Sequence, residues 1–214
     1  ETAAKYLSFK YPITEVIWIR FFSQTIVLFL IFLPFIKTKL ITHSLYLHIS
    51  RGVCLFFAAL FFFIGFTKTD LANATAIYKT SPIFLTLGSI FFLKETNFLV
   101  IKFLTVFLAL IGALIIIDPS SSSFSIYSFF PLFAAISLAI FGLITRYFGE
   151  RENPFTSIIY TALIGTILSS FLFPFFDWKP FVMQDIPFFV VIGTVSTLGH
   201  FLLIKAFQIE EASN

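Results

Sequence analysis

Residues 71–93 read LANATAIYKTSPIFLTLGSIFFL, and this stretch decides the class of fold. It is long enough to cross the core of a bilayer, which takes about 20 apolar residues of helix. Because lipid offers the backbone no hydrogen-bond partners, a spanning stretch of this kind has to be helical. Its one charged residue, Lys79, lies about 12 Å into the span at the rise of an α-helix. The stretch therefore predicts a transmembrane helix with a cation at depth.

Further apolar stretches of the same kind lie on both sides of this one. The seven predicted spans cover residues 15–35, 47–66, 71–93, 99–117, 124–145, 154–176 and 186–207. The segments between them are short and hold most of the charges, so any chemistry has to take place within the helices or at their ends. The expected fold class is all-α, a polytopic membrane protein with seven complete transmembrane helices.

The composition supports lipid as the solvent. Of the 214 residues, 58% are hydrophobic and 12% charged, whereas soluble domains are about 45–50% apolar and about 25% charged. Phe alone contributes 34 residues, and the mean hydropathy is +0.99. These values exclude a soluble enzyme, a disordered tail and a nucleic-acid binder. The single cysteine, Cys54, also excludes an internal disulfide and a Cys-based metal cluster.

Both ends of the chain read as interior segments of a longer membrane protein. The chain starts with Glu1 instead of Met, shows no signal peptide, and stops at Asn214 directly after a charged segment. We expect a fragment that lacks most of a first helix and all of helices nine and ten. The seven spans are then helices 2 to 8 of a ten-helix protein.

An internal repeat relates the two halves of the chain at an offset of about 141 residues. Each match is weak, but all of them share one order and one offset, which chance does not readily produce. The aligned pairs are Lys5-Tyr6 with Arg146-Tyr147, Pro12 with Pro154, Gly52 with Gly193, and residues 66–73 with 207–214.

One period of this repeat contains five helices. Because five is odd, the second copy enters the membrane from the opposite side, which predicts inverted five-helix repeats over residues 1–118 and, incompletely, 119–214. Inverted repeats are typical of secondary transporters that bind substrate near the midplane between the repeats. Lys and Arg near the helix ends number eight on one side and four on the other. The side with eight should face the cytoplasm, which predicts a multi-pass protein of the cell membrane.

The polar residues of the 71–93 span define the first candidate site. Helical spacing places Thr75, Lys79, Pro82, Thr86 and Ser89 on one narrow stripe. Tyr78 is either a further binding residue or an aromatic-belt or packing residue. A lysine this deep does not readily reach water, so the stripe is expected to face a cavity; a structural pairing of Lys79 with a carbonyl or an acid is the alternative. Pro82 should also bend the helix and free a backbone carbonyl.

Two other spans carry cationic or titratable groups. Arg20 and Gln24 lie one turn apart in the 15–35 span, where Arg20 either binds solute or extends to the membrane surface. Ser196, Thr197 and His200 share a face of the 186–207 span, either as cavity-lining groups or as packing. Arg51 and Lys205 lie near helix ends and are expected to extend to the headgroups.

The distribution of charge indicates the kind of solute. Asp and Glu residues lie at helix ends or in loops, so the interior of the predicted spans is cationic. A cationic interior favours a substrate that bears a carboxylate or another anionic group, with Lys79 as its main partner. The chain shows no nucleotide-binding, zinc-protease or nucleophile-elbow motif. We therefore expect no catalytic residue, no metal and no cofactor.

The segment 70–95 resembles the EamA-type ten-helix transporters of the drug/metabolite transporter superfamily. The similarity rests on the alanine-rich start of the segment, Pro82 before bulky apolar residues, and Glu95 at the close. The glycine-containing segment 109–115 is similar to the family's fifth helix, and Arg20 falls where many members carry an arginine. The resemblance implies solute transport by alternating access, with a central cavity between the repeats. Lys79 departs from the family's usual uncharged residue.

The sequence thus predicts a secondary transporter that moves a small polar metabolite, such as an amino acid or a cofactor. The alternatives are a seven-helix receptor or photoreceptor and an integral-membrane enzyme. The expected partners are a small-molecule solute and the lipid bilayer, with a homodimer as an option and no nucleic acid. The expected binding residues are Lys79, Thr75, Tyr78, Pro82, Thr86, Arg20, Gln24, Ser196, Thr197 and His200.

Overall fold

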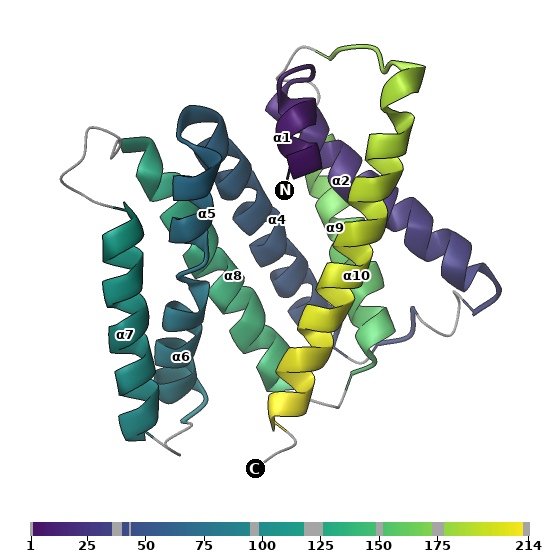
Figure 1. Ribbon diagram of the computed structural model, residues 1–214. Coiled ribbons are helices and arrows are strands. Elements are labelled where there is room, and N and C mark those ends of the chain that lie inside the picture. The colour runs from purple at the N-terminus through teal and green to yellow at the C-terminus, as the bar shows by residue number, and fades with distance from the viewer. Residues whose placement is uncertain are drawn as a thin grey trace. The chain divides into compact units, whose positions relative to one another are not determined.

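The structure is a computed structural model that describes residues 2–35, 40–42, 44–94, 99–117, 126–148, 152–172 and 178–211. Within these ranges the chain forms helices and no strand (Figure 1). The α-helices are α1 (Thr2–Ser8), α2 (Ile13–Phe32), α4 (Leu45–Lys68), α5 (Leu71–Tyr78), α6 (Ser81–Phe92), α7 (Leu99–Ile117), α8 (Phe129–Phe148), α9 (Pro154–Ser170) and α10 (Ile186–Glu211). The described 3₁₀ helices are η1 (Leu33–Phe35), η2 (Ile126–Ser128) and η5 (Met183–Asp185).

The described part of the chain contains four helical segments that are long and apolar enough to cross a membrane. They are Ile13–Phe32, Leu45–Lys68, Ile126–Tyr147 and Met183–Phe207. Val100–Gly112 and Pro154–Ser170 are shorter apolar helices. The prediction of an all-helical, polytopic membrane protein is confirmed, whereas the count of seven spans stays a prediction. Within the described residues, α9 stops at Ser170, and the end of the predicted span 154–176 lies outside them.

The chain divides into two compact units. Unit 1 comprises residues 1–56 and 144–214, and unit 2 comprises residues 57–143. Helices α4 and α8 each contribute to both units, because the boundaries fall inside them. The units therefore do not follow the predicted repeats, which divide the chain at residue 118, and that division stays a prediction.

Helices α2, α9 and α10 pack together in unit 1. Trp18 near the start of α2 donates its indole N–H to Ser170 at the end of α9, at 3.0 Å. At the other end of α2, the ring of Phe32 meets that of Phe155 at the start of α9, with centroids 4.9 Å apart. These contacts show that α2 and α9 run in opposite directions (Figure 1).

The helix starts follow the offset of the predicted repeat. Helix α2 begins at Ile13 and α9 at Pro154, which is 141 residues further on. Helix α4 begins at Leu45 and α10 at Ile186, with the same separation. Thr25 and Thr166, which contact each other, are also 141 residues apart. Two close helix contacts are related in the same way. An added Cβ on Gly52 would lie 2.8 Å from Ile164 Cβ, and one on Gly193 would lie 2.6 Å from Ser23 Cβ. The glycines that the repeat aligned are therefore equivalent sites of close helix approach.

Thr25 and Thr166 are repeat-equivalent residues that contact each other. Their hydroxyl oxygens lie 2.9 Å apart, and Thr166 also donates to the carbonyl of Ala162. Since a hydroxyl has one proton, Thr25 is the donor of the interhelical bond. Such a self-contact is expected where an approximate twofold axis passes between α2 and α9.

We expect the Thr25–Thr166 bond to contribute about 0.6 kcal/mol, the mean for polar contacts between membrane helices. Thr25→Val and Thr166→Val should therefore show this coupling in a double-mutant cycle of unfolding in mixed micelles. Thr25→Val paired with Thr105→Val serves as the control, because Thr105 is exposed and bonds only within its own helix. Strict additivity of Thr25→Val and Thr166→Val would show that the bond does not form.

Unit 2 contains α5, α6 and α7 with parts of α4 and α8. Gly88 of α6 faces Leu143, and the rings of Phe62 and Phe66 pack at 5.4 Å in the core of the unit. Helix α7 has the bounds that the sequence predicted for its span. It exposes bulky side chains such as Phe103 and Phe107. An exposed apolar face of this kind is suited to contact lipid.

Candidate functional site

Three polar side chains that the sequence singled out meet between α2 and α10. The Arg20 Nη2 atom lies 3.1 Å from Nε2 of His200, and the Gln24 side-chain amide lies 3.3 Å from Nδ1 of the same ring. Arg20 and His200 are half-buried, and Gln24 is fully buried. The structure therefore brings together one cationic, one titratable and one amide side chain, of which Arg20 and His200 lie 180 residues apart in the sequence.

The hydrogen-bond directions define the state of His200. A guanidinium only donates, so Nε2 of His200 must accept from Arg20, and the ring proton then lies on Nδ1. That N–H needs an acceptor, which Gln24 supplies once its amide is turned so that Oε1 faces the ring. As placed, Gln24 Oε1 has no partner among the described residues, which favours the turned amide. His200 is thus a neutral imidazole that orients Arg20 without cancelling its charge.

Two glycines allow this cluster to form. An added Cβ on Gly193 would lie 2.7 Å from the backbone carbonyl carbon of Ser23, so only glycine lets α10 approach α2 so closely. On α9, Gly165 receives the ring of Phe21, which is fully buried. The Arg20 guanidinium lies over the same ring at 5.1 Å. Close helix approach at small residues is typical of membrane proteins.

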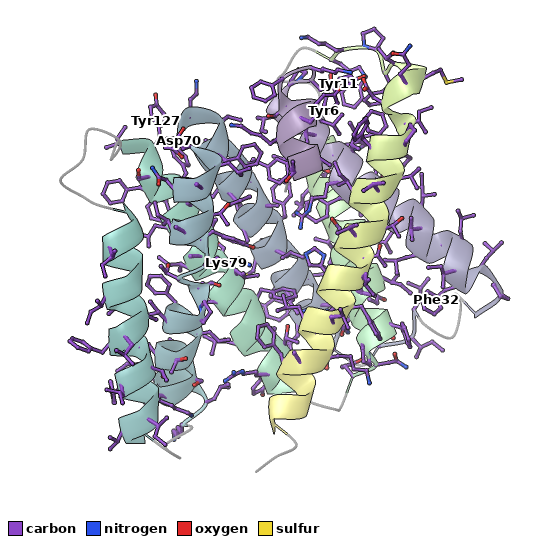
Figure 2. All side chains as sticks on the ribbon, in the orientation of Figure 1. Tyr6, Tyr11, Phe32, Asp70, Lys79 and Tyr127 are labelled. Atoms are coloured by element: carbon purple, nitrogen blue, oxygen red, sulfur yellow. The ribbon has the colours of Figure 1, made fainter. Side chains whose placement is uncertain are left out.

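The span that contains Lys79 is interrupted. Helix α5 ends at Tyr78, and α6 begins at Ser81 with Pro82 as its second residue. The bend expected from Pro82 is therefore a break, because proline has no N–H to continue the helical ladder. Lys79 lies at the break and is exposed within unit 2 (Figure 2). Interrupted helices form the substrate sites of many transporters.

The ten predicted binding residues fall into two groups. Arg20, Gln24 and His200 contact one another in unit 1, and Ser196 and Thr197 lie on the same helix as His200; the Thr197 hydroxyl donates to the Gly193 carbonyl. The other five belong to unit 2. Among them the ring of Tyr78 packs on Phe62 with centroids 4.7 Å apart, which is a packing contact. The group in unit 2 comprises Thr75, Tyr78, Lys79, Pro82 and Thr86.

A second polar cluster in unit 1 was not predicted. His48 Nε2 lies 3.6 Å from Glu152 Oε2, and Thr42 donates to Glu152 Oε1 at 2.9 Å. His48 also stacks on the ring of Tyr160 with centroids 5.0 Å apart. No motif marked these residues, because they come from three separate segments; only the position of Glu152 just before the repeat-aligned Pro154 could have drawn attention to it.

Arg51 corrects one sequence expectation. It was expected to extend to the headgroups, but it is fully buried in unit 1 and donates to the Thr161 hydroxyl at 3.3 Å. The position near a helix end suggested access to water, and packing against α9 removes that access. Lys205, for which the same was expected, is exposed.

A third polar cluster connects the residues before α2 with the residue before α10. Asp185 accepts from Lys10 Nζ at 2.7 Å and from the Tyr11 hydroxyl at 2.9 Å. The Asp185 carboxylate raises the pKa of Lys10, and desolvation raises the pKa of Tyr11. Lys10 therefore stays positively charged, and Tyr11 stays uncharged, well into the alkaline range. Nearby, Glu15 accepts the backbone N–H of Lys179.

Apolar helices, a broken helix and cationic side chains within the helices are features typical of membrane transporters. The chain matches the EamA-like transporter family over residues 2–118 and 125–214, and it therefore belongs to this family. This membership favours a transporter over the enzyme and receptor alternatives.

Curated relatives agree with the family match. An S-adenosylmethionine uptake transporter of Rickettsia bellii is 28% identical over 217 residues, which cover 100% of this chain and 72% of the relative. A riboflavin transporter of Vibrio cholerae is 26% identical over 226 residues, covering 99% and 72%. A pseudopaline exporter of Pseudomonas aeruginosa is 27% identical over 218 residues, covering 94% and 71%. No solved structure matches the chain. The chain is thus a multi-pass membrane transporter of a small metabolite.

Proposed function

We propose that the chain moves a small carboxylate-bearing metabolite, such as an amino acid or a cofactor, across the cell membrane by alternating access. The observation that carries the proposal is the Arg20–His200–Gln24 cluster. A guanidinium binds a carboxylate through paired N–H donors, and neutral His200 orients the Arg20 guanidinium through a contact of 3.1 Å. Buried charges in membrane helices are costly, so a cation kept at this place needs a function.

The remaining predicted residues receive roles in the same proposal. Arg20 binds the carboxylate, whereas Gln24 and His200 position the Arg20 guanidinium. Ser196 and Thr197 lie on the face of α10 that carries His200. Lys79, at the break between α5 and α6 in unit 2, is proposed as a solute-binding cation in its own right, together with Thr75, Tyr78, Pro82 and Thr86 of the same unit. Alternating access follows from rocking of two inverted repeats, residues 1–118 and 119–214, about the bound solute.

The solutes named for the relatives provide contrasting probes. S-adenosylmethionine carries a carboxylate and riboflavin does not, so the two separate carboxylate recognition from recognition of a heterocycle. We expect proteoliposomes of the purified protein to accumulate radiolabelled S-adenosylmethionine saturably, with riboflavin as a weak competitor. Competition by simple amino acids would extend the class. Uptake of riboflavin with no effect of any carboxylate would overturn the proposed substrate class.

Lys79→Met tests the role of the broken helix. Loss of a charge-assisted contact of about 1.5–3 kcal/mol should weaken solute binding by about 10- to 100-fold. Solute affinity is measured from the concentration dependence of uptake. Lys68→Met is the matched control, since Lys68 lies at the end of α4 in the same unit and is exposed. An unchanged affinity in Lys79→Met removes Lys79 from the site.

A further inference from the structure

The clusters around Asp185 and Glu152 occupy related places in the two repeats. Tyr11 and Glu152 stand two residues before α2 and α9, and Ser44 and Asp185 stand directly before α4 and α10. The related helices begin at the same 141-residue offset. Each cluster contains one buried carboxylate, which ties the start of one helix to residues at the start of another. In an inverted repeat, related places lie at opposite sides of the membrane.

The cation beside each carboxylate differs between the two clusters. Asp185 pairs with Lys10, whose ammonium keeps its charge across the physiological range. Glu152 faces His48, and imidazole is the side chain whose ordinary titration lies closest to neutral pH. Of the two clusters, the Glu152 cluster is therefore the one that contains a side chain whose ordinary titration lies near neutral pH.

His48 lies in buried surroundings, where a change in its charge has a large electrostatic effect on its neighbours. His48 and Arg51 are fully buried, whereas 9% of the Glu152 side chain is exposed, which gives a proton a point of entry. The charged groups that act on His48 include Arg51 on the same helix and Glu152. The titratable ring of Tyr160 stacks on it from α9, and α2 and α10 carry Arg20 and His200. One added proton makes the charge of this cluster more positive by one in a medium of low dielectric.

We propose that His48 and Glu152 form a proton-binding site that couples proton movement to solute transport. The proton enters at the exposed edge of Glu152 and is held between Glu152 Oε2 and His48 Nε2. The added positive charge lies in the same unit as Arg20, so it favours the carboxylate of a solute there. Proton and solute are then released together when alternating access opens the site to the other side of the membrane. The coupling rests on the proposed transport function, whereas proton binding by the pair does not.

Titration of His48 tests proton binding without any solute. The purified protein in lipid nanodiscs is labelled with ¹³C-histidine, and His48→Asn identifies the His48 signal among the three histidines. We expect the signal to titrate between about pH 4 and 8, and Glu152→Gln to move the titration to lower pH because the anionic partner is gone. Lys10→Gln, at the related place in the other repeat, should leave it unchanged. A His48 signal that is constant over this range, or unaffected by Glu152→Gln, overturns the site.

A pH gradient across proteoliposomes tests coupling. With one proton per solute, a gradient of one pH unit drives accumulation by up to about tenfold. Wild type and Lys10→Gln should show this gradient response with radiolabelled S-adenosylmethionine. His48→Asn and Glu152→Gln should lose it while keeping solute exchange, which needs no net proton movement. An equal gradient response in all four proteins overturns coupling. If no probe crosses, the proposed function fails, and the His48 titration still decides the proton site.

Discussion

Replacing Arg20 with Gln should weaken solute binding by about 10- to 100-fold, because the charge-assisted hydrogen bonds of a guanidinium contribute about 1.5–3 kcal/mol. The fold should be kept, since glutamine removes the charge but leaves a polar side chain with N–H donors at this position. Arg20→Lys should bind with intermediate affinity, because the charge remains but the planar pair of donors is lost. Affinity is measured by binding of radiolabelled S-adenosylmethionine to the purified protein.

Lys205→Gln is the matched control for the Arg20 prediction. It removes one positive charge from the same unit, but Lys205 is exposed and lies on the last turns of α10. Binding by this variant should equal that of the wild type. If Arg20→Gln binds as tightly as the wild type, Arg20 makes no carboxylate contact. If Lys205→Gln weakens binding equally, the effect of Arg20→Gln is one of general charge and not of a contact at Arg20.

Gly165→Ala should destabilise the protein by about 1–3 kcal/mol, the usual cost of overpacking. An added Cβ would overlap the ring of Phe21, and that ring has no room to move because it is fully buried. The same substitution gains about 1 kcal/mol of intrinsic helix propensity, so the measured loss is net of this gain. Stability is measured by unfolding in mixed micelles, and solute binding should fall with it because Phe21 packs under Arg20.

Gly199→Ala provides the opposite result from the same chemical change. Nothing lies within 4 Å of an added Cβ at Gly199, which is in the same helix as His200. Without a steric cost, the gain in helix propensity remains, and the variant should be as stable as the wild type or more so by up to about 1 kcal/mol. Equal effects of Gly165→Ala and Gly199→Ala would show that the approach of α9 to α2 is looser than the structure has it.

Helix existence was predictable from the sequence because it depends on local length and apolarity. The bounds of α7 match the predicted span 99–117, and the starts of α9 and α10 match two more. Helix interruption was predictable only in part. Pro82 signalled a bend in the 71–93 span, and α5 ends at Tyr78, whose carbonyl would have accepted the N–H that proline lacks. That the bend is a full break depends also on turn hydrogen bonds such as that from Thr80 to Ile77.

The candidate site was predictable as a set of residue types but not as a set of contacts. Arg20, Gln24 and His200 stood out because polar groups in apolar spans are costly. Their meeting depends on the approach of α10 to α2 at Gly193, which no local pattern reveals. Arg51 shows the opposite failure: its place near a helix end suggested water, and packing against α9 buries it.

The sequence by itself determined that this protein is a helical membrane protein, because hydropathy is summed along the chain. A cationic interior was expected in addition, but the structure also buries the carboxylates of Glu15, Glu152 and Asp185. The sequence also indicated the offset that relates the helix starts. Only the tertiary structure decided which polar groups meet, because a contact between residues 180 apart depends on how closely two helices approach. For the same reason, only the structure paired His48 with Glu152 at one end and Lys10 with Asp185 at the other.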